Sequence, residues 1–170
     1  MESNEKFTIG ALVNNHYGVL NRVAGLFSKR GYNIDSLAVG ETENPAYSRM
    51  TIVCTGGEYM RGQAVRQLRK LVDVISVQPL DDGSTVAVEH LLIKVRVNDR
   101  QKNSLNQLIN LFNGKVRDFG ADFITVEITA PPNYIDDFIE GLRPYGILET
   151  CRSGALAMSH GTGNMLTAPN

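Results

Sequence analysis

The segment NNHYGVLNRVAGLFSKRGYNID, residues 14–35, decides how the first half of the chain folds. Its apolar residues recur at the spacing of a helix with one buried face: Val19, Val23 and Phe27. Two basic residues and then Gly31 follow this stripe, which is typical of a helix C-terminus. A polar, glycine-containing loop precedes the helix, and Asn33 follows it. Helix formation alone does not account for these residue types at the two ends.

The elements around this helix predict the order β-α-β-β-α-β. Alternating and β-branched residues predict strands before and after the helix, and a second apolar periodicity predicts a second helix. The predicted strands are Lys6–Val13, 33–42, 48–55 and 72–80, and the second helix spans 58–72.

The second half of the chain repeats this order without obvious sequence identity to the first. The predicted elements are a strand at 89–97, a helix at 101–112, a hairpin of 115–120 with 122–130, a helix at 131–142, and one or two strands within 146–159. We therefore expect an α+β protein of two ferredoxin-like βαββαβ domains. The expected boundaries are a domain at 1–80, a linker at 81–86, a domain at 87–160 and a disordered tail at 161–170.

Composition limits the classes of function. Of 170 residues, 42% are hydrophobic and 21% charged, which favours a folded, soluble protein. Seventeen basic and eighteen acidic residues nearly cancel, which argues against a nucleic-acid-binding surface. No apolar run reaches the roughly 20 residues that span a bilayer, and the N-terminus is polar, so we expect no membrane association and a cytoplasmic protein.

The sequence shows no pattern for catalysis or metal binding. The three histidines lack a second ligand at metal-binding spacing, and no nucleophile motif or phosphate-binding loop is present. Asp136 and Asp137 are adjacent on a predicted helix and point in different directions, so a solvated face is favoured over a catalytic pair. Cys54 and Cys151 lie in apolar, strand-like segments, and we expect both to be buried or half-buried free thiols.

The loop at residues 15–20 could hold a small carboxylate. A helix N-terminus presents unpaired N–H groups and partial positive charge, and Gly18 lets a ligand approach the main chain. An α-amino acid would also need an acceptor for its ammonium group, which the amide of Asn33 offers. Apolar walls for its side chain could come from Val19, Leu20 and Ile34.

Asn33 would lie about 18 Å from the start of the helix, at about 1.5 Å per residue. A complete site therefore requires that a second subunit supplies Asn33. Dimerisation is expected on other grounds too, because a domain of about 75 residues has a small core and its sheet leaves an open edge.

A purely structural interpretation remains open from spacing alone. Asn14 or Asn15 could be a turn residue, His16 an exposed loop residue, and Asn33 part of the turn that follows Gly31. The basic side chains of the second helix could dock a partner or simply be solvated: Arg61, Arg66, Arg69 and Lys70.

Several motifs together resemble one family. They are N-x-x-G-V-L-N-R-V-A-G-L-F-S-K-R-G-Y-N-I-D-S-L, S-R-M-T-I and L-R-K-L-V-D-V in the first half, and HLLIKV, FNGKVRD, ITVEIT and RSGALAMS in the second. Over roughly residues 6–160 the chain resembles the small, regulatory subunits of acetolactate synthase.

The resemblance implies an N-terminal ACT domain that dimerises edge to edge and binds valine. It also implies a large catalytic partner that this subunit activates and makes sensitive to valine, with thiamine diphosphate, magnesium and FAD on that partner and no cofactor on this chain. The valine site would comprise Asn15, His16, Tyr17, Gly18, Val19, Leu20, Asn33 and Ile34. Asn21 would be a neighbour that affects feedback, and His16 and Tyr17 would contribute mainly through their backbone.

One position departs from the family pattern. Val88 precedes Glu89 where members commonly have an Arg-Glu pair, so an ion pair made there in relatives is expected to be missing. Two alternatives remain at this stage. A free-standing ACT-type sensor would need another partner, and a small autonomous enzyme would show activity from the purified chain alone.

Overall fold

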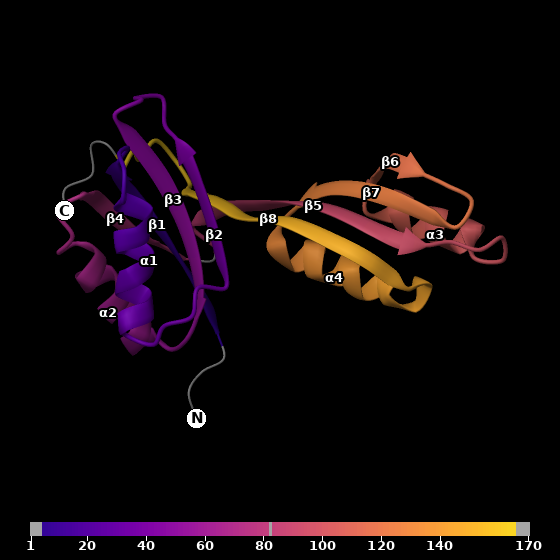
Figure 1. The fold of residues 1–170 in the computed structure, drawn as a ribbon, viewed down its shortest axis with the longest axis horizontal. Coiled ribbons are helices and arrows are strands. Elements are labelled where there is room, and N and C mark those ends of the chain that lie inside the picture. Colours follow the sequence, from indigo (N-terminus) through magenta and orange to yellow (C-terminus); the bar gives the residue numbers. More distant parts are fainter. Residues whose placement is uncertain (1–4, 82, 166–170) are drawn as a thin grey trace. The chain divides into compact units, whose positions relative to one another are not determined.

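The computed structural model describes residues 5–81 and 83–165, which form two compact units (Figure 1). The first unit contains the described residues up to Val86 together with residues 155–165, and the second spans Ala87–Gly154. The second unit thus ends before residue 160, and the last part of the chain belongs with the first unit. Each unit is described separately below.

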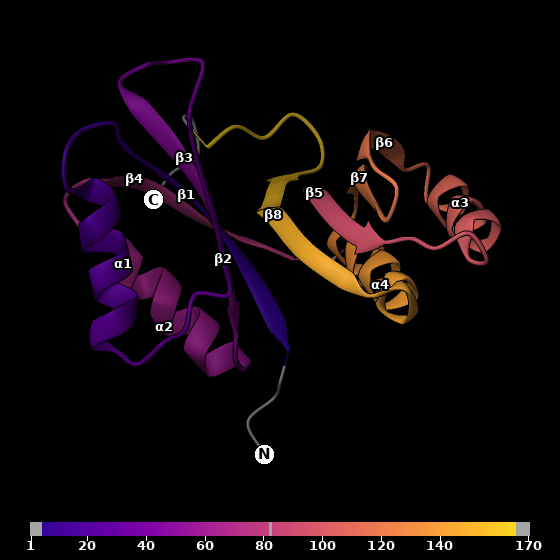
Figure 2. The ribbon, with the colours of Figure 1, turned by 45° about the vertical axis from the view of Figure 1, so that its right-hand side comes forward.

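The first unit is an antiparallel sheet with two helices on one face (Figure 2). Its elements are β1 (Lys6–Asn14), α1 (Val19–Lys29), β2 (Ser36–Glu41), β3 (Tyr47–Thr55), α2 (Glu58–Leu68) and β4 (Val74–Leu80). The strand order is β2-β3-β1-β4, so β2 and β4 are the edges of this sheet.

Every second side chain of β1 points toward the helices and forms the core beneath them. Ile9, Ala11 and Val13 are at most 1% exposed and belong to one cluster with the apolar stripe of α1. That stripe is Val19, Val23 and Phe27, all buried as predicted. Burying side chains of this size stabilises the fold by about 1.5–3 kcal/mol each.

Helix α2 is shorter than predicted and ends at Leu68 instead of Val72. The N–H groups of Lys70 and Leu71 donate to carbonyls three residues earlier, at 3.1 and 3.0 Å, which tightens and closes the last turn. The chain then turns at Asp73, whose carbonyl accepts from Asn14 N at 2.8 Å. Arg69 and Lys70, which were predicted to lie on the helix, therefore lie in the turn that follows it.

The other face of this sheet is covered by residues 155–165, which we call the C-terminal strap. Ala155 N donates to Ser36 Oγ at 3.2 Å, and Ser76 Oγ donates to the carbonyl of Met165 at 2.9 Å. Leu12 on the sheet and Met165 on the strap are 2% and 6% exposed.

The structure thus differs from the predicted disordered tail at residues 161–165, while 166–170 lie outside the described residues. A single apolar anchor such as Met165 produces no periodicity that a sequence pattern could reveal.

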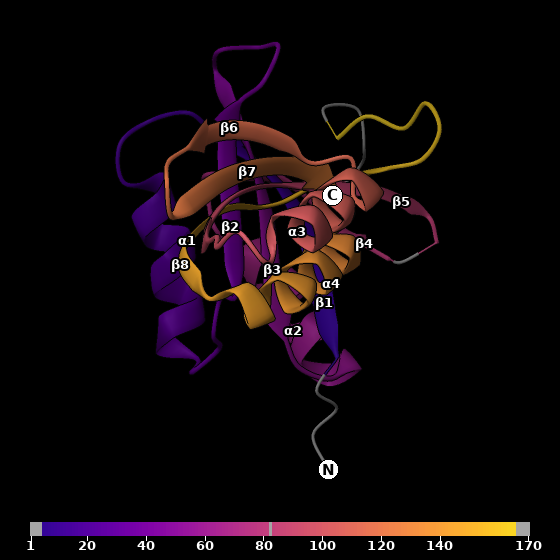
Figure 3. The ribbon, with the colours of Figure 1, turned by 90° about the vertical axis from the view of Figure 1, so that its right-hand side faces the viewer.

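The second unit has the same element order. Its elements are β5 (Thr85–Arg96), α3 (Lys102–Leu111), β6 (Lys115–Phe119), β7 (Phe123–Ala130), α4 (Pro132–Leu142), a 3₁₀ turn η1 (Arg143–Tyr145) and β8 (Ile147–Ser159). The strand order is β6-β7-β5-β8, and Figure 3 shows α3 and α4 together beneath this sheet. The predicted fold class, two βαββαβ units with antiparallel sheets, is confirmed.

Two details differ from the predicted boundaries. Strand β5 starts at Thr85, inside the predicted linker, and residues 146–159 form a single strand from Ile147. In the described ranges, 5–81 and 83–165, we find no helix with the length and apolar character needed to cross a membrane.

The two cysteines have different environments. Cys54 is fully buried in β3, as expected, and burial raises the pKa of its thiol to about 12, with a smaller contribution from Asp35. The expectation was wrong for Cys151, which is exposed. It lies on edge strand β8 within residues 148–153, all of which are exposed.

We predict that one thiol per folded chain reacts rapidly with a disulfide reagent at pH 8. A thiol with a raised pKa in the core is neither ionised nor accessible, whereas Cys151 is accessible. Cys151→Ser is expected to abolish the fast phase, and Cys54→Ser to leave it intact. Stoichiometric fast labelling of the Cys151→Ser protein would contradict the placement of Cys54.

Candidate ligand site at the start of the first helix

The loop between β1 and α1 is tied to three neighbouring segments. Asn14 N donates to Asp73 O and Asn15 N to Ala46 O, both at 2.8 Å. The Asn15 amide Nδ2 also donates to Glu41 Oε2 at 3.2 Å and to Pro45 O at 3.0 Å. These bonds hold the loop against the C-terminal end of β2, and the Asn15 side chain serves this purpose.

Gly18 occupies the N-cap of α1 in a left-handed conformation, with φ of 82°. A Cβ added there would meet only one neighbour within 4 Å, the Nη2 of Arg22 at 3.7 Å. The space over Gly18 is thus open, and a small ligand can reach the main chain.

The first turn of α1 presents unpaired donors. The first N–H to find a helical acceptor is that of Arg22, which donates to Gly18 O at 3.0 Å. No residue in 5–81 or 83–165 accepts from the N–H groups of Gly18, Val19, Leu20 and Asn21, and no side chain caps the helix. Four such donors, together with the helix dipole, favour an anion.

Arg22 adds a positive charge beside these donors. Its Nη1 pairs with Asp73 Oδ2, and His16 Nε2 lies 3.0 Å from Asp73 Oδ1. The Asp73 side chain is only 8% exposed, whereas those of Arg22 and His16 are each 50% exposed. Asp73 therefore orients two cationic or polar groups at the start of α1.

Sequence reasoning missed the pair of Arg22 with Asp73, because 51 residues separate them. The available signal was a single acid inside the apolar run KLVDVISV, since a buried carboxylate requires a partner.

At the other end of α1, the amide of Asn33 has a fixed orientation. Its Nδ2 donates to Asp35 Oδ1 at 2.7 Å, and Thr55 Oγ1 donates to Asp35 Oδ2 at 2.7 Å. The Oδ1 of Asn33 is therefore the atom that can accept a bond from a ligand.

The structure brings only part of the predicted site together in one chain. Asn15, His16, Tyr17, Gly18 and Leu20 surround the start of α1, and Asn21 lies on its exposed first turn. The Val19 side chain is 3% exposed and packs in the core, so this residue offers its N–H and not an apolar wall. Asn33 and Ile34 follow the other end of an 11-residue helix, about 16 Å away at about 1.5 Å per residue.

Glu89, at the start of the second unit, pairs with an arginine that is distant in sequence. Glu89 is 4% exposed and accepts from Arg152 Nε at 2.6 Å and Nη2 at 2.8 Å, while Arg152 Nη1 donates to Asp136 Oδ1 at 2.8 Å. These hydrogen bonds, that to Glu89 above all, raise the pKa of Arg152. Asp136 is thus part of an ion-pair network inside the second unit.

In the part of the chain that the structure describes, no three His, Cys, Asp or Glu side chains gather as a metal site would require. The groups at the start of α1 are hydrogen-bond donors and a cation, which can bind a small anion.

The βαββαβ order and antiparallel sheet of the first unit are those of an ACT-type domain. A family model described as the AHAS small subunit-like ACT domain matches residues 9–76. A second, described as the small subunit of acetolactate synthase, matches residues 88–161. The chain belongs to the family of acetolactate synthase small subunits.

The similarity to individual relatives extends over nearly the whole chain. The chain is 43% identical over 158 residues to a probable acetolactate synthase small subunit of Methanothermobacter thermautotrophicus, covering 92% of this chain and 94% of that protein. It is 40% identical to the acetolactate synthase small subunit of Mycolicibacterium smegmatis, with 91% of each chain covered. The crystal structure of the Thermotoga maritima small subunit superposes with a TM-score of 0.83 at 36% identity, covering 94% of this chain and 99% of that one.

We predict that Gly18→Ala destabilises the protein by about 1–2 kcal/mol, because an L-residue is strained in the left-handed region. Gly25→Ala is the matched control. Gly25 lies inside α1 with no atom within 4 Å of an added Cβ, so alanine there should stabilise by about 0.5–1 kcal/mol. Urea unfolding of both variants measures the difference, and equal effects of the two substitutions would refute the strain at Gly18.

Proposed function

We propose that this chain is the non-catalytic regulatory subunit of an acetolactate synthase, and that its N-terminal unit binds valine between two copies of the chain. The observation that carries the proposal is the half-site described above. The unbonded N–H groups of Gly18–Asn21 lie beside a cation, Arg22, while the remaining acceptor needed by an amino acid lies at the far end of α1.

The carboxylate of valine would bind at the start of α1. The backbone donors and the helix dipole favour negative charge there, and the Arg22 guanidinium adds a charge-assisted donor. Such bonds contribute about 1.5–3 kcal/mol each. Leu20, 47% exposed, offers the apolar surface for the valine side chain.

The strand directions explain how a second copy completes the site. Strands β1 and β2 are both antiparallel to β3, so they run in the same direction. The loop at Asn15 therefore lies at the C-terminal end of β2, as its bond to Glu41 shows, whereas Asn33 precedes the N-terminal end.

β2 is an edge strand of six residues, about 20 Å long at about 3.3 Å per residue. If two copies pair their β2 strands antiparallel about a twofold axis, Asn33 of one copy lies next to the loop of the other. Pairing through the other edge, β4, would not bring them together.

Asn33 from the second copy would accept a hydrogen bond from the ligand ammonium. Its Nδ2 is engaged by Asp35, so its Oδ1 faces the ligand, and the Asp35 carboxylate favours a positive charge nearby. Ile34, half-buried beside it, would complete the apolar wall.

The partner is the large catalytic subunit, which the name "small subunit" of the relatives implies. The thiamine diphosphate chemistry would take place there, and this chain would raise the activity of that subunit. Valine would favour one geometry of the small-subunit dimer, and a coupling of about 1–3 kcal/mol would suffice for feedback inhibition.

We predict that Gly18→Asp abolishes inhibition by valine but preserves activation of the large subunit. The added carboxylate would occupy the space of the ligand carboxylate and repel it. The assay measures acetolactate formation by the reconstituted complex with and without valine, and wild-type inhibition of the variant complex would show that the site is elsewhere. A variant that neither activates nor is inhibited would argue against separate regulatory and activating surfaces.

We further predict complementation between two defective subunits. Gly18→Asp retains Asn33, and Asn33→Ala retains the loop, so a mixed dimer contains one intact site and one doubly altered site. A catalytic complex assembled with either homodimer should be insensitive to valine, whereas one assembled with the purified mixed dimer should recover part of the inhibition, because it holds one intact site. No recovery in the mixed dimer would mean that both residues act within the same chain or that the pocket is not shared.

A further inference from the structure

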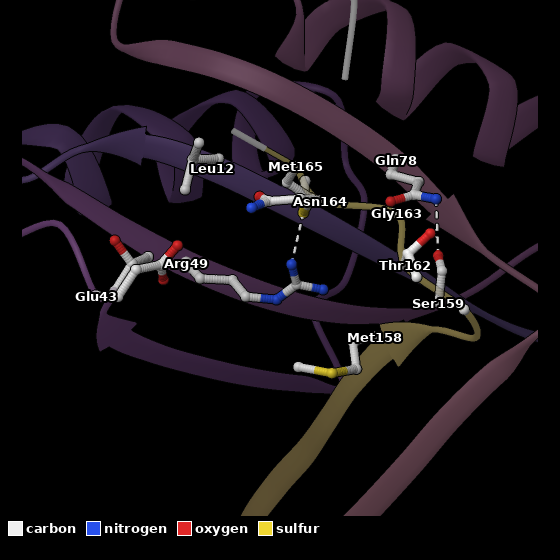
Figure 4. A pocket seen from close by; sticks show the side chains of 12 residues that line it. Leu12, Glu43, Arg49, Gln78, Met158, Ser159, Thr162, Gly163, Asn164 and Met165 are labelled. Carbon is white, nitrogen blue, oxygen red and sulfur yellow. Dashed lines mark hydrogen bonds between the residues drawn. The ribbon is translucent and has the colours of Figure 1, made fainter. Parts of the chain in front are cut away.

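We infer that the first unit contains a second ligand site, separate from the start of α1, which takes a free α-amino acid with an apolar side chain. The site is a cavity of about 360 Å³ on the sheet face opposite the helices, beneath the end of the C-terminal strap (Figure 4). Its walls come from β1, β3 and β4, from the turn after β2, and from residues 158–165.

Arg49 is the cation of this cavity. Its half-buried guanidinium donates from Nη2 to Ala157 O and from Nη1 to Met165 Sδ, both at 2.7 Å. A guanidinium has five N–H donors, so further donors are left for a ligand. Burial lowers the pKa of Arg49, which reflects the cost of a cation that has lost water without gaining an anion.

Arg49 differs from the other arginines that make ion pairs. Arg22, Arg61, Arg117, Arg143 and Arg152 each lie within 4 Å of a carboxylate. Within residues 5–81 and 83–165, none pairs with Arg49, although it is half-buried. An acidic ligand group would supply the missing counter-charge, and a carboxylate fits the planar donor pair of a guanidinium.

A second charged residue in the lining, Glu43, favours a zwitterion over a simple anion. Glu43 lines the cavity and makes no ion pair with the described residues, and Figure 4 shows the Arg49 side chain running from the Glu43 side toward Met165. A carboxylate at Arg49 and an ammonium at Glu43 would satisfy both charges, whereas phosphate would be repelled by Glu43.

The rest of the cavity lining combines apolar groups with polar ones, the latter including Thr42, Ser159 and Thr162. Leu12 on β1, Met158 and Met165 contribute apolar surface, and methionine side chains adapt to ligands of different shape. Gln78 is already engaged by Ser159 Oγ at 2.7 Å, so it helps to hold the strap. An aliphatic amino acid matches this combination of two charges and an apolar wall.

All of these residues belong to one unit of one chain, so the site does not need a second copy. A ligand here would contact both the sheet and the strap, and binding would therefore stabilise the strap in its docked position.

The test uses calorimetry on the full-length Gly18→Asp protein, in which the proposed valine site is blocked, with valine, leucine and methionine as probes. At least one should bind with one molecule per chain. Arg49→Gln in the same background should weaken binding tenfold or more. Asn33→Ala serves as a second background in case Gly18→Asp folds poorly. In that background too, one molecule of the amino acid should bind per chain.

Ser76→Ala is the matched control, because it removes a bond to the strap at Met165 O without changing the charge of the cavity. Its affinity should stay within threefold of the parent. The amides of the same amino acids should bind weakly to the parent, and Arg49→Gln should then cause no further loss.

The inference is overturned by any of three results. They are no binding of any probe in either background, an equal loss for Arg49→Gln and Ser76→Ala, or acetate and inorganic phosphate binding as tightly as the amino acids. None of these results bears on valine inhibition at the start of α1, because that is measured by the response of the catalytic complex.

Discussion

The arrangement of the first unit depends on the fact that β1 and β2 run in the same direction, each paired antiparallel to β3. This direction follows from α1, which carries the chain back along the sheet before β2 begins. As a consequence, the loop after β1 and the segment before β2 lie at opposite ends of one edge strand. No movement within one chain can join Gly18 to Asn33 without dismantling the helix between them. A ligand site that used both residues would therefore have to be shared between two copies of the chain.

Patterns local in sequence predicted most of the secondary structure. The four-residue recurrence of Val19, Val23 and Phe27 defined α1, because each of these side chains enters one core. The end of α2 was misplaced, since the turn at Asp73 depends on a bond to Asn14, which is remote in sequence. Cys151 was misjudged because edge position in a sheet is not encoded in the strand itself.

Interactions between distant residues account for what sequence reasoning missed at the sites. Asn15 and Gly18, residues of the proposed ligand site, were named from the sequence because a helix start has a local signature. Arg22 was not, because its role depends on a buried acid more than two elements away. The bond of Glu89 to Arg152 likewise joins β5 and β8, so no residue near Glu89 in the sequence indicates this ion pair.

The strap gives the first sheet a second covered face, which an isolated βαββαβ unit of this length would lack. Leu12 and Leu80 are 2% and 5% exposed although neither belongs to the core beneath the helices. Their burial against residues contributed by the end of the chain explains why the first unit is discontinuous in sequence. Arg49 is desolvated by the same contact, since its guanidinium bonds to Ala157 and Met165.

The bonds around the loop bear on how valine would act under the proposed function. Asp73, Ala46, Glu41 and Pro45 already hold Asn14 and Asn15, and the pair with Asp73 holds Arg22. A ligand that bound only to this loop would find it preformed and would have little conformational change to drive. A ligand shifts an equilibrium only by the difference in its affinity for two states. Under the proposed function, the two states differ in whether Asn33 of the second copy lies close enough to bind the ligand. Valine would therefore favour the dimer geometry in which the two β2 strands pair and bring Asn33 to the loop.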